Sequence, residues 1–345
     1  MKAAVLTAPS MLSIENVPRP QCGPGEILVR IESAAICGTD RRTLHYGHPR
    51  VKYPRILGHE NSGVVAEVGP GCSISVGTRV AVSAVIPCLN CRYCREGWHT
   101  VCERQETIGY EYDGGFAEYL LAPESAVAAG LVNPLPDGVG FDEGALAEPL
   151  ACAMNGQDIV GICQGDTVVI LGAGAMGCIH AMLARRRGAS SVAMVDPQGE
   201  RLECAARFGA DAFHTALPED MVGRADVAIV ACSSSTAQGE ALRSVRRRGR
   251  VSLFAGLPAQ EESECFDTRL VHYSELSVFG ASGSAPEQNR LALRLMAAGA
   301  VQVGALVTST YPLSMANEAF ATSALGSQLK VVIKPGMSSR KRCEA

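Results

Sequence analysis

The sequence has few aromatic residues, no long hydrophobic run and no excess of positive charge. Aromatic side chains make up 5% of its 345 residues, whereas hydrophobic residues make up 47%, which is enough for a buried core. No apolar stretch reaches the roughly 18 residues of a membrane-spanning helix, and the N-terminus lacks the apolar segment of a signal peptide. The net charge of -4 argues against a surface that binds nucleic acid through general basicity. We therefore expect a soluble, cytoplasmic protein that binds neither membranes nor nucleic acid.

The length and the cysteine distribution set further limits. A chain of 345 residues exceeds the size at which a single core stops growing, so we expect more than one domain. Fourteen cysteines are present, of which four are clustered and the others are scattered, a distribution typical of a reducing compartment rather than of a disulfide framework. The arginine runs at residues 185–187 and 246–248 are interpreted as solvated helix ends.

The clustered cysteines predict a structural zinc site. Two, two and seven residues separate them, a spacing that lets a short loop wrap around one tetrahedral ion. The intervening residues are mostly polar, which indicates an exposed loop rather than four buried free thiols, the alternative interpretation. Because four protein ligands leave no open position on the metal, the catalytic chemistry must lie elsewhere. The predicted ligands are Cys88, Cys91, Cys94 and Cys102, in a lobe over about residues 86–103.

The pattern of strands and helices predicts two kinds of domain. Short β-branched runs broken by Gly and Pro indicate a partly open antiparallel β-domain before about residue 150. Beyond it, apolar strands alternate with helical patterns, which is typical of a doubly wound parallel sheet. We expect those strands at 168–171, 191–195, 211–214, 227–231, 250–254 and 275–280.

The last part of the sequence is expected to rejoin the first domain. A helix at 288–298 is followed by strand-like segments at 303–311 and 329–333, and by a tail from residue 338 that looks disordered. The predicted division is 1–153 for the β-rich domain, 154–286 for the parallel-sheet domain, and 287–345 for the return and the tail.

A glycine-rich turn predicts a dinucleotide site. The sequence Gly172-Ala-Gly174-Ala175-Met176-Gly177 follows a buried strand and opens an apolar helix, the context that makes a GxGxxG motif informative. Gly172 allows the tight turn, Gly174 lets the pyrophosphate approach the backbone, and Gly177 allows close packing of helix on strand. The phosphates would lie at the helix N-terminus, where free amides favour an anion.

Asp196 predicts the nucleotide type. It lies 19 residues beyond Gly177, where a carboxylate can accept hydrogen bonds from the adenosine ribose and repel a 2′-phosphate. We therefore expect NAD rather than NADP. The alternative is a turn-forming Asp before Pro197.

A second, mixed set of residues predicts a catalytic metal. Cys37, His59, Glu60 and Glu148 offer sulfur, nitrogen and oxygen ligands, a mixture that holds zinc and leaves a position for water or substrate. Each residue alone is ambiguous, because a core thiol, a core histidine or a carboxylate at a helix start would look the same. Glycines around the candidates and the second zinc site favour the joint interpretation.

In these motifs the chain resembles the zinc-dependent medium-chain dehydrogenases of the alcohol dehydrogenase superfamily, within them the sorbitol and threonine dehydrogenase-like polyol branch. The resemblance runs from Met1 to about Lys334. It implies an α/β protein with a GroES-like β-rich catalytic domain and a Rossmann domain, two zinc ions per chain, NAD as oxidant, and a homodimer or homotetramer. It also implies that Cys37 and His59 hold the catalytic zinc, while Glu60 and Glu148 compete for or share the remaining protein positions.

The resemblance assigns further residues. It implies that Thr39 passes the substrate proton towards solvent and that Arg201 lies near the adenosine ribose. It places the following strand-end residues along the nucleotide: Cys232, Ala255, Gly256, Leu257, Ala281 and Ser282. One departure is Arg42, where relatives carry a histidine three residues after the threonine. Arg42 is interpreted either as a solvated charge or as a group that meets the cofactor phosphates or an anionic substrate.

These observations predict an enzyme that transfers a hydride between NAD and a secondary alcohol of a polyol, sugar or cyclitol, reversibly. Zinc would act as the Lewis acid. The alternative is an amino-alcohol dehydrogenase of the threonine 3-dehydrogenase or aminocyclitol type, which would share every residue named. Zinc-free quinone reductases are disfavoured because they need neither cysteine set. A nucleic-acid-binding zinc module is disfavoured by the acidic balance and by the cysteine spacing.

Overall fold

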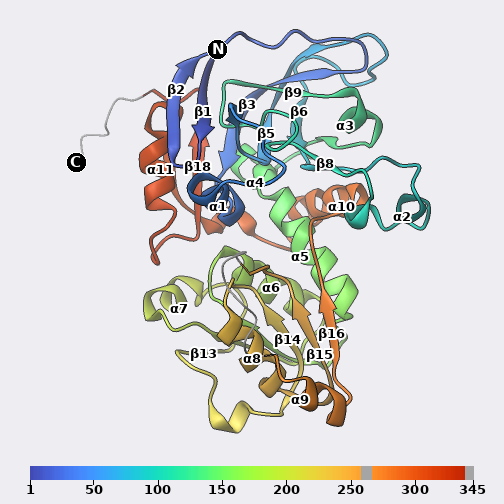
Figure 1. The fold of residues 1–345 in the computed structure, drawn as a ribbon, viewed down its shortest axis with the longest axis vertical. Helices are drawn as coiled ribbons and strands as arrows, with labels where there is room; N and C mark the ends of the chain where they lie inside the picture. Colours follow the sequence, from blue (N-terminus) through green and yellow to red (C-terminus); the bar gives the residue numbers. More distant parts are fainter. Residues whose placement is uncertain (258–265, 339–345) are drawn as a thin grey trace. The chain divides into compact units, whose positions relative to one another are not determined.

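The computed structural model describes residues 1–257 and 266–338 of the chain (Figure 1), so most of the tail predicted to be disordered lies outside the described residues. The chain forms two compact units. The first unit comprises Met1–Ala151, Ser284–Leu325 and Lys330–Ala345, and the second comprises Cys152–Gly283 and Gly326–Leu329. In the described part, no helix has both the length and the apolar character that crossing a membrane requires.

The first unit is built on a seven-stranded sheet in which the strand order is β10-β6-β5-β3-β18-β17, with β9 also pairing with β3. Its pairs are antiparallel except for β17 and β18, which run parallel. The strands are β3 (Ile27–Ala35), β5 (Glu60–Val68), β6 (Arg79–Val82), β9 (Tyr119–Ala122), β10 (Val132–Pro134), β17 (Val307–Pro312) and β18 (Lys330–Lys334). Val332 of β18 pairs with Ala35 of β3, so the end of the chain completes a sheet begun near its start.

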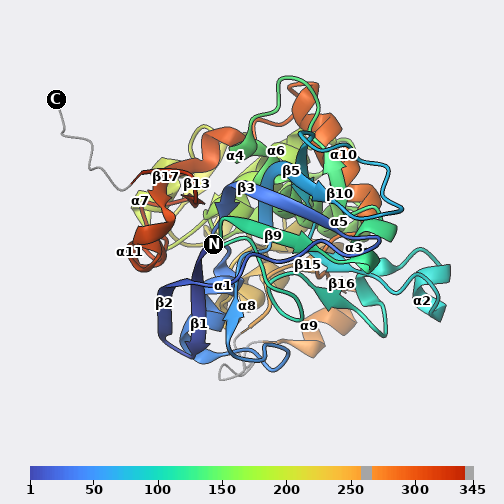
Figure 2. The same ribbon diagram turned by 90° about the horizontal axis from the view of Figure 1, so that it is seen from above.

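Two smaller sheets and several short helices complete the first unit. The smaller sheets are β2 (Met11–Asn16) with β1 (Lys2–Ala8) and β4 (Arg55–Ile56), and β7 (Val85–Ile86) with β8 (Glu106–Thr107). The helices are α1 (Gly38–Tyr46), α2 (Arg92–Arg95), α3 (Glu124–Ala128), α4 (Phe141–Ala145), α10 (Pro286–Ala297), α11 (Ala316–Thr322) and the 3₁₀ turns η1 (His99–Val101), η3 (Val303–Leu306) and η4 (Leu313–Met315). Helix α11 lies beside β2 in both ribbon views (Figures 1 and 2). Edge-to-face packing of Phe116 on Phe320, with ring centroids 5.5 Å apart, joins the two ends of the chain in one core.

The second unit contains a six-stranded, fully parallel sheet in the order β13-β12-β11-β14-β15-β16. Renumbered from its own first strand, this is the 3-2-1-4-5-6 order of a dinucleotide-binding fold. Its strands are β11 (Thr167–Leu171), β12 (Ser191–Val195), β13 (Ala212–His214), β14 (Ala225–Val230), β15 (Val245–Leu253) and β16 (Ser277–Gly280). Its helices are α6 (Ala175–Arg186), α7 (Gly199–Ala205), α8 (Ser235–Ser244), α9 (Thr268–Tyr273) and the turn η2 (Glu219–Met221), while α5 (Ala147–Val160) begins in the first unit. The apolar runs of β11 and β14 are buried, as expected for strands covered on both faces.

Two sequence expectations are wrong in detail. The segment 303–311 is not strand throughout, because its first four residues form η3 and the strand β17 begins only at Val307, where pairing with Lys330 starts. The arginine run 246–248 does not end a helix. Helix α8 stops at Ser244, Val245 adopts an extended backbone, and the three arginines are exposed residues at the start of β15.

Candidate functional site

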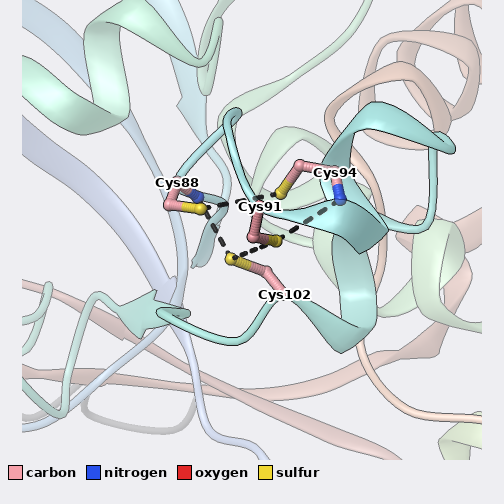
Figure 3. A group of neighbouring side chains, drawn as sticks. All are labelled: Cys88, Cys91, Cys94 and Cys102. Atoms are coloured by element: carbon pink, nitrogen blue, oxygen red, sulfur yellow. Dashed lines mark hydrogen bonds between the residues drawn. The ribbon is translucent and has the colours of Figure 1, made fainter.

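The four cysteines of the predicted lobe converge on one point (Figure 3). Their sulfur atoms all lie within 4.8 Å of one another; those of Cys91 and Cys102 are 3.9 Å apart and those of Cys88 and Cys94 are 4.0 Å apart. These distances exclude disulfides, whose sulfurs are about 2.05 Å apart. They match the separation of about 3.8 Å that follows from zinc–sulfur bonds of about 2.3 Å in a tetrahedron. The donor set therefore fits a structural zinc ion.

Backbone amides stabilise negative charge on these sulfurs. Cys91 caps the N-terminus of α2, and its sulfur accepts a hydrogen bond from the amide of Cys94. Cys102 accepts from the amides of Cys88 at 3.2 Å and of Arg104 at 3.4 Å. The backbone amide of Asn90, assisted by Cys102 and Arg104, lowers the pKa of Cys88 to about 6. The pKa of Cys91 is also lowered, whereas burial raises the pKa of Cys94 to about 12 and raises that of Cys102. The amides thus favour two of the thiolates that a metal requires, and the charge of a bound ion would favour the other two.

A mixed cluster forms where β3 ends and β5 begins. One donor atom each from Cys37, His59 and Glu60 lies within 4.8 Å of the others. Sheet pairing explains the meeting: Ala35 at the end of β3 pairs with Glu60 at the start of β5, so the residues that flank this pair are neighbours. Sulfur, imidazole and carboxylate together are the donor types of a catalytic zinc site, and the cluster fits that ion.

Asp40 orients two members of the mixed cluster. One of its oxygens accepts from the Cys37 amide at 2.9 Å, and the other lies 3.1 Å from Nδ1 of His59. The imidazole therefore donates through Nδ1 and presents Nε2 as the metal-binding atom, the arrangement found behind zinc-ligating histidines. Burial lowers the pKa of His59, but the charges of Asp40 and Cys37 outweigh it, and the net pKa lies well above its ordinary value.

Glu60 forms a buried ion pair with Lys330. The lysine ammonium is 2.5 Å from both carboxylate oxygens, and both residues are almost inaccessible to solvent. Lys330 is the first residue of β18, so the return of the chain supplies this cation. Burial raises the pKa of Glu60 more than the nearby ammonium lowers it, while the negative charges around Lys330 outweigh burial and raise its pKa. Glu148, in the first turn of α5, is buried and influences both partners, but it is outside the cluster of three donors.

Arg42 lies against Thr39. Both residues belong to α1, and the guanidinium donates a hydrogen bond of 3.0 Å to the threonine hydroxyl. The side chain is half-buried, and its bond to Thr39 is a contact that neither interpretation of Arg42 included, so both interpretations stay predictions.

Sequence reasoning missed two aromatic rings beside the mixed cluster. The ring of Tyr110 lies edge-on to His59, with centroids 6.4 Å apart, and the ring of His48 lies 4.3 Å from that of Tyr110. Burial, above all, raises the pKa of Tyr110 to about 12. The glycines of this segment were a signal in the sequence, because glycine is needed where two backbones touch. A Cβ on Gly114 would lie 2.2 Å from the carbonyl oxygen of Gly58. The segment that carries Tyr110 thus packs backbone to backbone against the residue before His59.

The glycine turn of the second unit has the form that a dinucleotide needs. Gly172 has a φ of 108° and lies against Cys232, so a side chain would not fit there. A Cβ on Gly177 would lie 1.9 Å from the carbonyl oxygen of Gly172, which shows how closely α6 packs on the end of β11. At Gly174, the N-cap of α6, a Cβ would meet nothing within 4 Å. The turn therefore leaves open space at the helix N-terminus, where Ala175 and Met176 begin α6.

Asp196 lies beside this turn. Its carboxylate accepts from the amides of Ala173 and Gln198, both at 2.9 Å, and one oxygen is 3.9 Å from Arg201. The bond to Gln198 agrees with the turn-forming interpretation, and contact with a ribose stays a prediction. The remaining predicted contacts follow the carboxyl ends of β14, β15 and β16, where ligands of such sheets bind: Cys232, Ala255, Gly256, Leu257, Ala281 and Ser282.

Comparisons with known proteins agree with this geometry. Residues 23–136 match the family described as alcohol dehydrogenase GroES-like domain, and residues 175–298 match the zinc-binding dehydrogenase family. An alcohol dehydrogenase of Geobacillus stearothermophilus is 34% identical, with 93% of this chain and 95% of the relative covered. An L-threonine 3-dehydrogenase of Pyrococcus abyssi is 32% identical, with 92% of each covered. A zinc-binding dehydrogenase of Sinorhizobium meliloti 1021, solved bound to NADP, is 32% identical with a TM-score of 0.89, with 97% of this chain and 99% of that one covered.

The chain therefore belongs to the zinc-dependent medium-chain dehydrogenases, and it is an oxidoreductase that acts on alcohols. Within this family its relatives include the polyol branch, with a sorbitol dehydrogenase of Bacillus subtilis 29% identical over 97% of both chains. The predicted family and the predicted fold class are confirmed.

Proposed function

We propose that this protein transfers a hydride between NAD and a secondary alcohol of a polyol, sugar or cyclitol, in a reversible reaction between alcohol and ketone. The observation that carries the proposal is the convergence of Cys37, His59 and Glu60 on one point in the first unit. The open glycine turn beside Asp196 in the second unit supports a nucleotide as the hydride acceptor.

The mixed cluster would hold the catalytic zinc, and the four-thiol lobe would hold the structural zinc. When bound, the catalytic ion supplies Lewis-acid chemistry that lowers the pKa of an alcohol. We assign Cys37, His59 and Glu60 as its protein ligands because their donor atoms lie together, with Glu148 as the alternative carboxylate. Lys330 favours the ionised form of Glu60 and fixes its orientation.

Thr39 would handle the substrate proton. Its hydroxyl oxygen accepts from Arg42, which leaves the hydroxyl able to donate one hydrogen bond and to accept one more. A guanidinium has no lone pair with which to accept a proton, so Arg42 orients Thr39 but cannot carry the proton further. If Arg42→Ala left nucleotide affinity and turnover unchanged, this role for Arg42 would be wrong.

NAD is proposed as the preferred nucleotide because the Asp196 carboxylate would repel a 2′-phosphate. The relative from Sinorhizobium meliloti was solved with NADP, so the preference has to be measured on this chain. We expect kcat/KM to be at least about tenfold higher with NAD than with NADP. A clear advantage of NADP would overturn the assignment.

A second candidate is the oxidation of an amino alcohol, which the identity to an L-threonine 3-dehydrogenase favours. A screen of NAD reduction with polyols, cyclitols, amino alcohols and sugar phosphates separates the candidates, with metal content measured on the same preparation. We expect activity with a polyol or cyclitol and two zinc ions per chain. An active, metal-free preparation would refute the proposed mechanism. A cytoplasmic location and a homodimer or homotetramer stay predictions.

A further inference from the structure

Two hydrogen-bond donors beside the mixed cluster bond to no other described residue. They are the hydroxyl of Tyr110 and the Nε2–H of His48, whose rings lie 4.3 Å apart and are tilted by 33°. The tautomer of His48 follows from its other nitrogen, because Nδ1 accepts a hydrogen bond from the amide of Arg50 at 3.3 Å. A neutral imidazole that accepts at Nδ1 must donate at Nε2.

His48 is uncharged at neutral pH. Burial, and then the positive charge of Arg50, lower the pKa of His48 below its ordinary value, and Arg42 adds to the effect. The phenol of Tyr110 is also neutral under these conditions, since even an unperturbed tyrosine ionises only near pH 10. The pair therefore offers two uncharged donors, one of which, the phenol, can also accept, and a hydroxyl group can engage both.

The two rings lie on the same side of the first unit as the reacting groups. Tyr110 contacts the edge of the His59 ring, and the charges of His59, Asp40 and Cys37 all act on its hydroxyl. His48 is near enough to Arg42 to be influenced by its charge, and Arg42 in turn bonds to Thr39. A substrate whose alcohol reached the Cys37–His59 centre and Thr39 would therefore present its neighbouring carbon to these rings.

The pair is held rigidly. The Arg50 guanidinium bonds to both carboxylate oxygens of Glu111 at 2.8 and 2.9 Å, and to Thr107 and the carbonyl of Gln105. These bonds tie the loop that carries His48 to the segment that carries Tyr110, and the guanidinium also lies 5.5 Å from the Tyr110 ring. Through these contacts Arg50 positions the two rings. Donors fixed before binding lose little entropy when they engage a ligand.

We propose that Tyr110 and His48 form a specificity site that binds the hydroxyl group next to the alcohol being oxidised, so that vicinal diols are preferred over mono-alcohols and over vicinal amino alcohols. This inference rests on the proposed function and names its substrate class. A 2-amino alcohol would place an ammonium beside the pair, where the Tyr110 hydroxyl can accept one hydrogen bond but the Nε2–H of His48 offers no lone pair and is left opposed to another donor.

The test compares butane-2,3-diol with butan-2-ol, which differ by one hydroxyl, under NAD reduction. We expect the ratio of their kcat/KM values to favour the diol and to fall about tenfold in Tyr110→Phe, the upper range for one neutral hydrogen bond. Tyr112→Phe is the matched control, because that hydroxyl lies two residues away and donates to Glu106 at 2.9 Å. Its ratio should equal that of the wild type. Equal ratios in the wild type, Tyr110→Phe and Tyr112→Phe would overturn the inference.

Histidine variants test the second donor. His48→Gln keeps an N–H donor and should retain most of the preference for the diol, whereas His48→Leu should lose it. If His48→Gln and His48→Leu gave the same ratio of kcat/KM values for diol and mono-alcohol, His48 would contribute packing and no hydrogen bond. As a readout independent of turnover, calorimetry of butane-2,3-diol binding to the NADH-loaded protein should show a Kd about tenfold weaker in Tyr110→Phe.

The outcomes separate the inference from the proposed function. If no alcohol in the panel reduces NAD, the proposed function is wrong. Two outcomes would refute the specificity site and leave the proposed dehydrogenase function intact. One is that 3-aminobutan-2-ol is oxidised as efficiently as butane-2,3-diol. The other is that a carboxylated or phosphorylated polyol is preferred through Arg42.

Discussion

The four-thiol lobe and the mixed Cys37–His59–Glu60 cluster are built in different ways. The lobe draws its four ligands from residues 88–102, and among the described residues these thiols cluster with one another and with Tyr93 of the same loop. The mixed cluster takes Cys37 from the N-cap of α1, His59 from just before β5 and Glu60 from the start of β5. Its orienting Asp40 lies in α1, and its buried Lys330 lies in a strand 270 residues away from Glu60. The first is thus a local fold that an ion completes, and the second is a product of the whole sheet. The predictions below follow from this difference.

Cysteine removal from the lobe should have the largest effect on folding. In small zinc-dependent folds the metal contributes about 10–16 kcal/mol, which is also folding free energy. We expect Cys102→Ser to lose one zinc ion per chain, to lower the unfolding temperature and to make residues 88–102 sensitive to protease. Cys163→Ser is the control, because that thiol is exposed and outside the lobe. A Cys102→Ser protein with normal stability would show that the lobe folds without the metal.

Histidine removal from the mixed cluster should abolish chemistry and spare the fold. His59→Ala should also lose one zinc ion, but turnover should fall at least about a thousandfold while the unfolding temperature changes little, since the ion contributes several kcal/mol to the transition state. His45→Ala, on the exposed side of α1, is the matched control and should stay active. Loss of folded protein in His59→Ala would contradict the contrast between the two clusters.

Unpairing Glu60 should destabilise the first unit. Lys330→Met leaves a buried carboxylate without its cation, which costs about 3–5 kcal/mol in the free energy of unfolding. The double variant Glu60→Gln with Lys330→Met should recover much of that loss. Arg92→Ala breaks the exposed pair with Glu96 and should cost only about 0.3–0.5 kcal/mol. If Lys330→Met lowered the free energy of unfolding as little as Arg92→Ala does, Glu60 would not be buried as an ion.

The smallest predicted effect concerns Asp40. Asp40→Asn keeps the size of the side chain but removes the charge behind His59, and such partners typically affect metal affinity by about 10–100-fold. In competition with a chelator, this variant should therefore lose the zinc of the mixed cluster, and with it the activity, before the lobe loses its zinc. Asp142→Asn, which alters the pair with Lys334, should leave the chelator profile unchanged.

The same contrast decides what the sequence could predict. The lobe, the glycine turn and the parallel strands were predictable because each depends on spacing within a short stretch. The pairing of Glu60 with Lys330 was not, since no sequence pattern relates two residues 270 positions apart. Tyr110 and His48 were missed because their positions depend on contacts between distant segments: backbone packing of Gly114 on Gly58 brings Tyr110 to His59, and His48 lies against Tyr110. The arginines at 246–248 were wrongly predicted to end a helix, because a run of charges indicates exposure to solvent but not the type of secondary structure.

The late position of β18 has a consequence for biosynthesis. The second unit is nearly contiguous, so it can fold while the ribosome is still adding residues, whereas the sheet of the first unit waits for its last strand. Until Lys330 emerges, a nascent chain exposes the edge of β3 and carries Glu60 without its counter-ion. We therefore expect the catalytic centre to mature only after translation is almost complete.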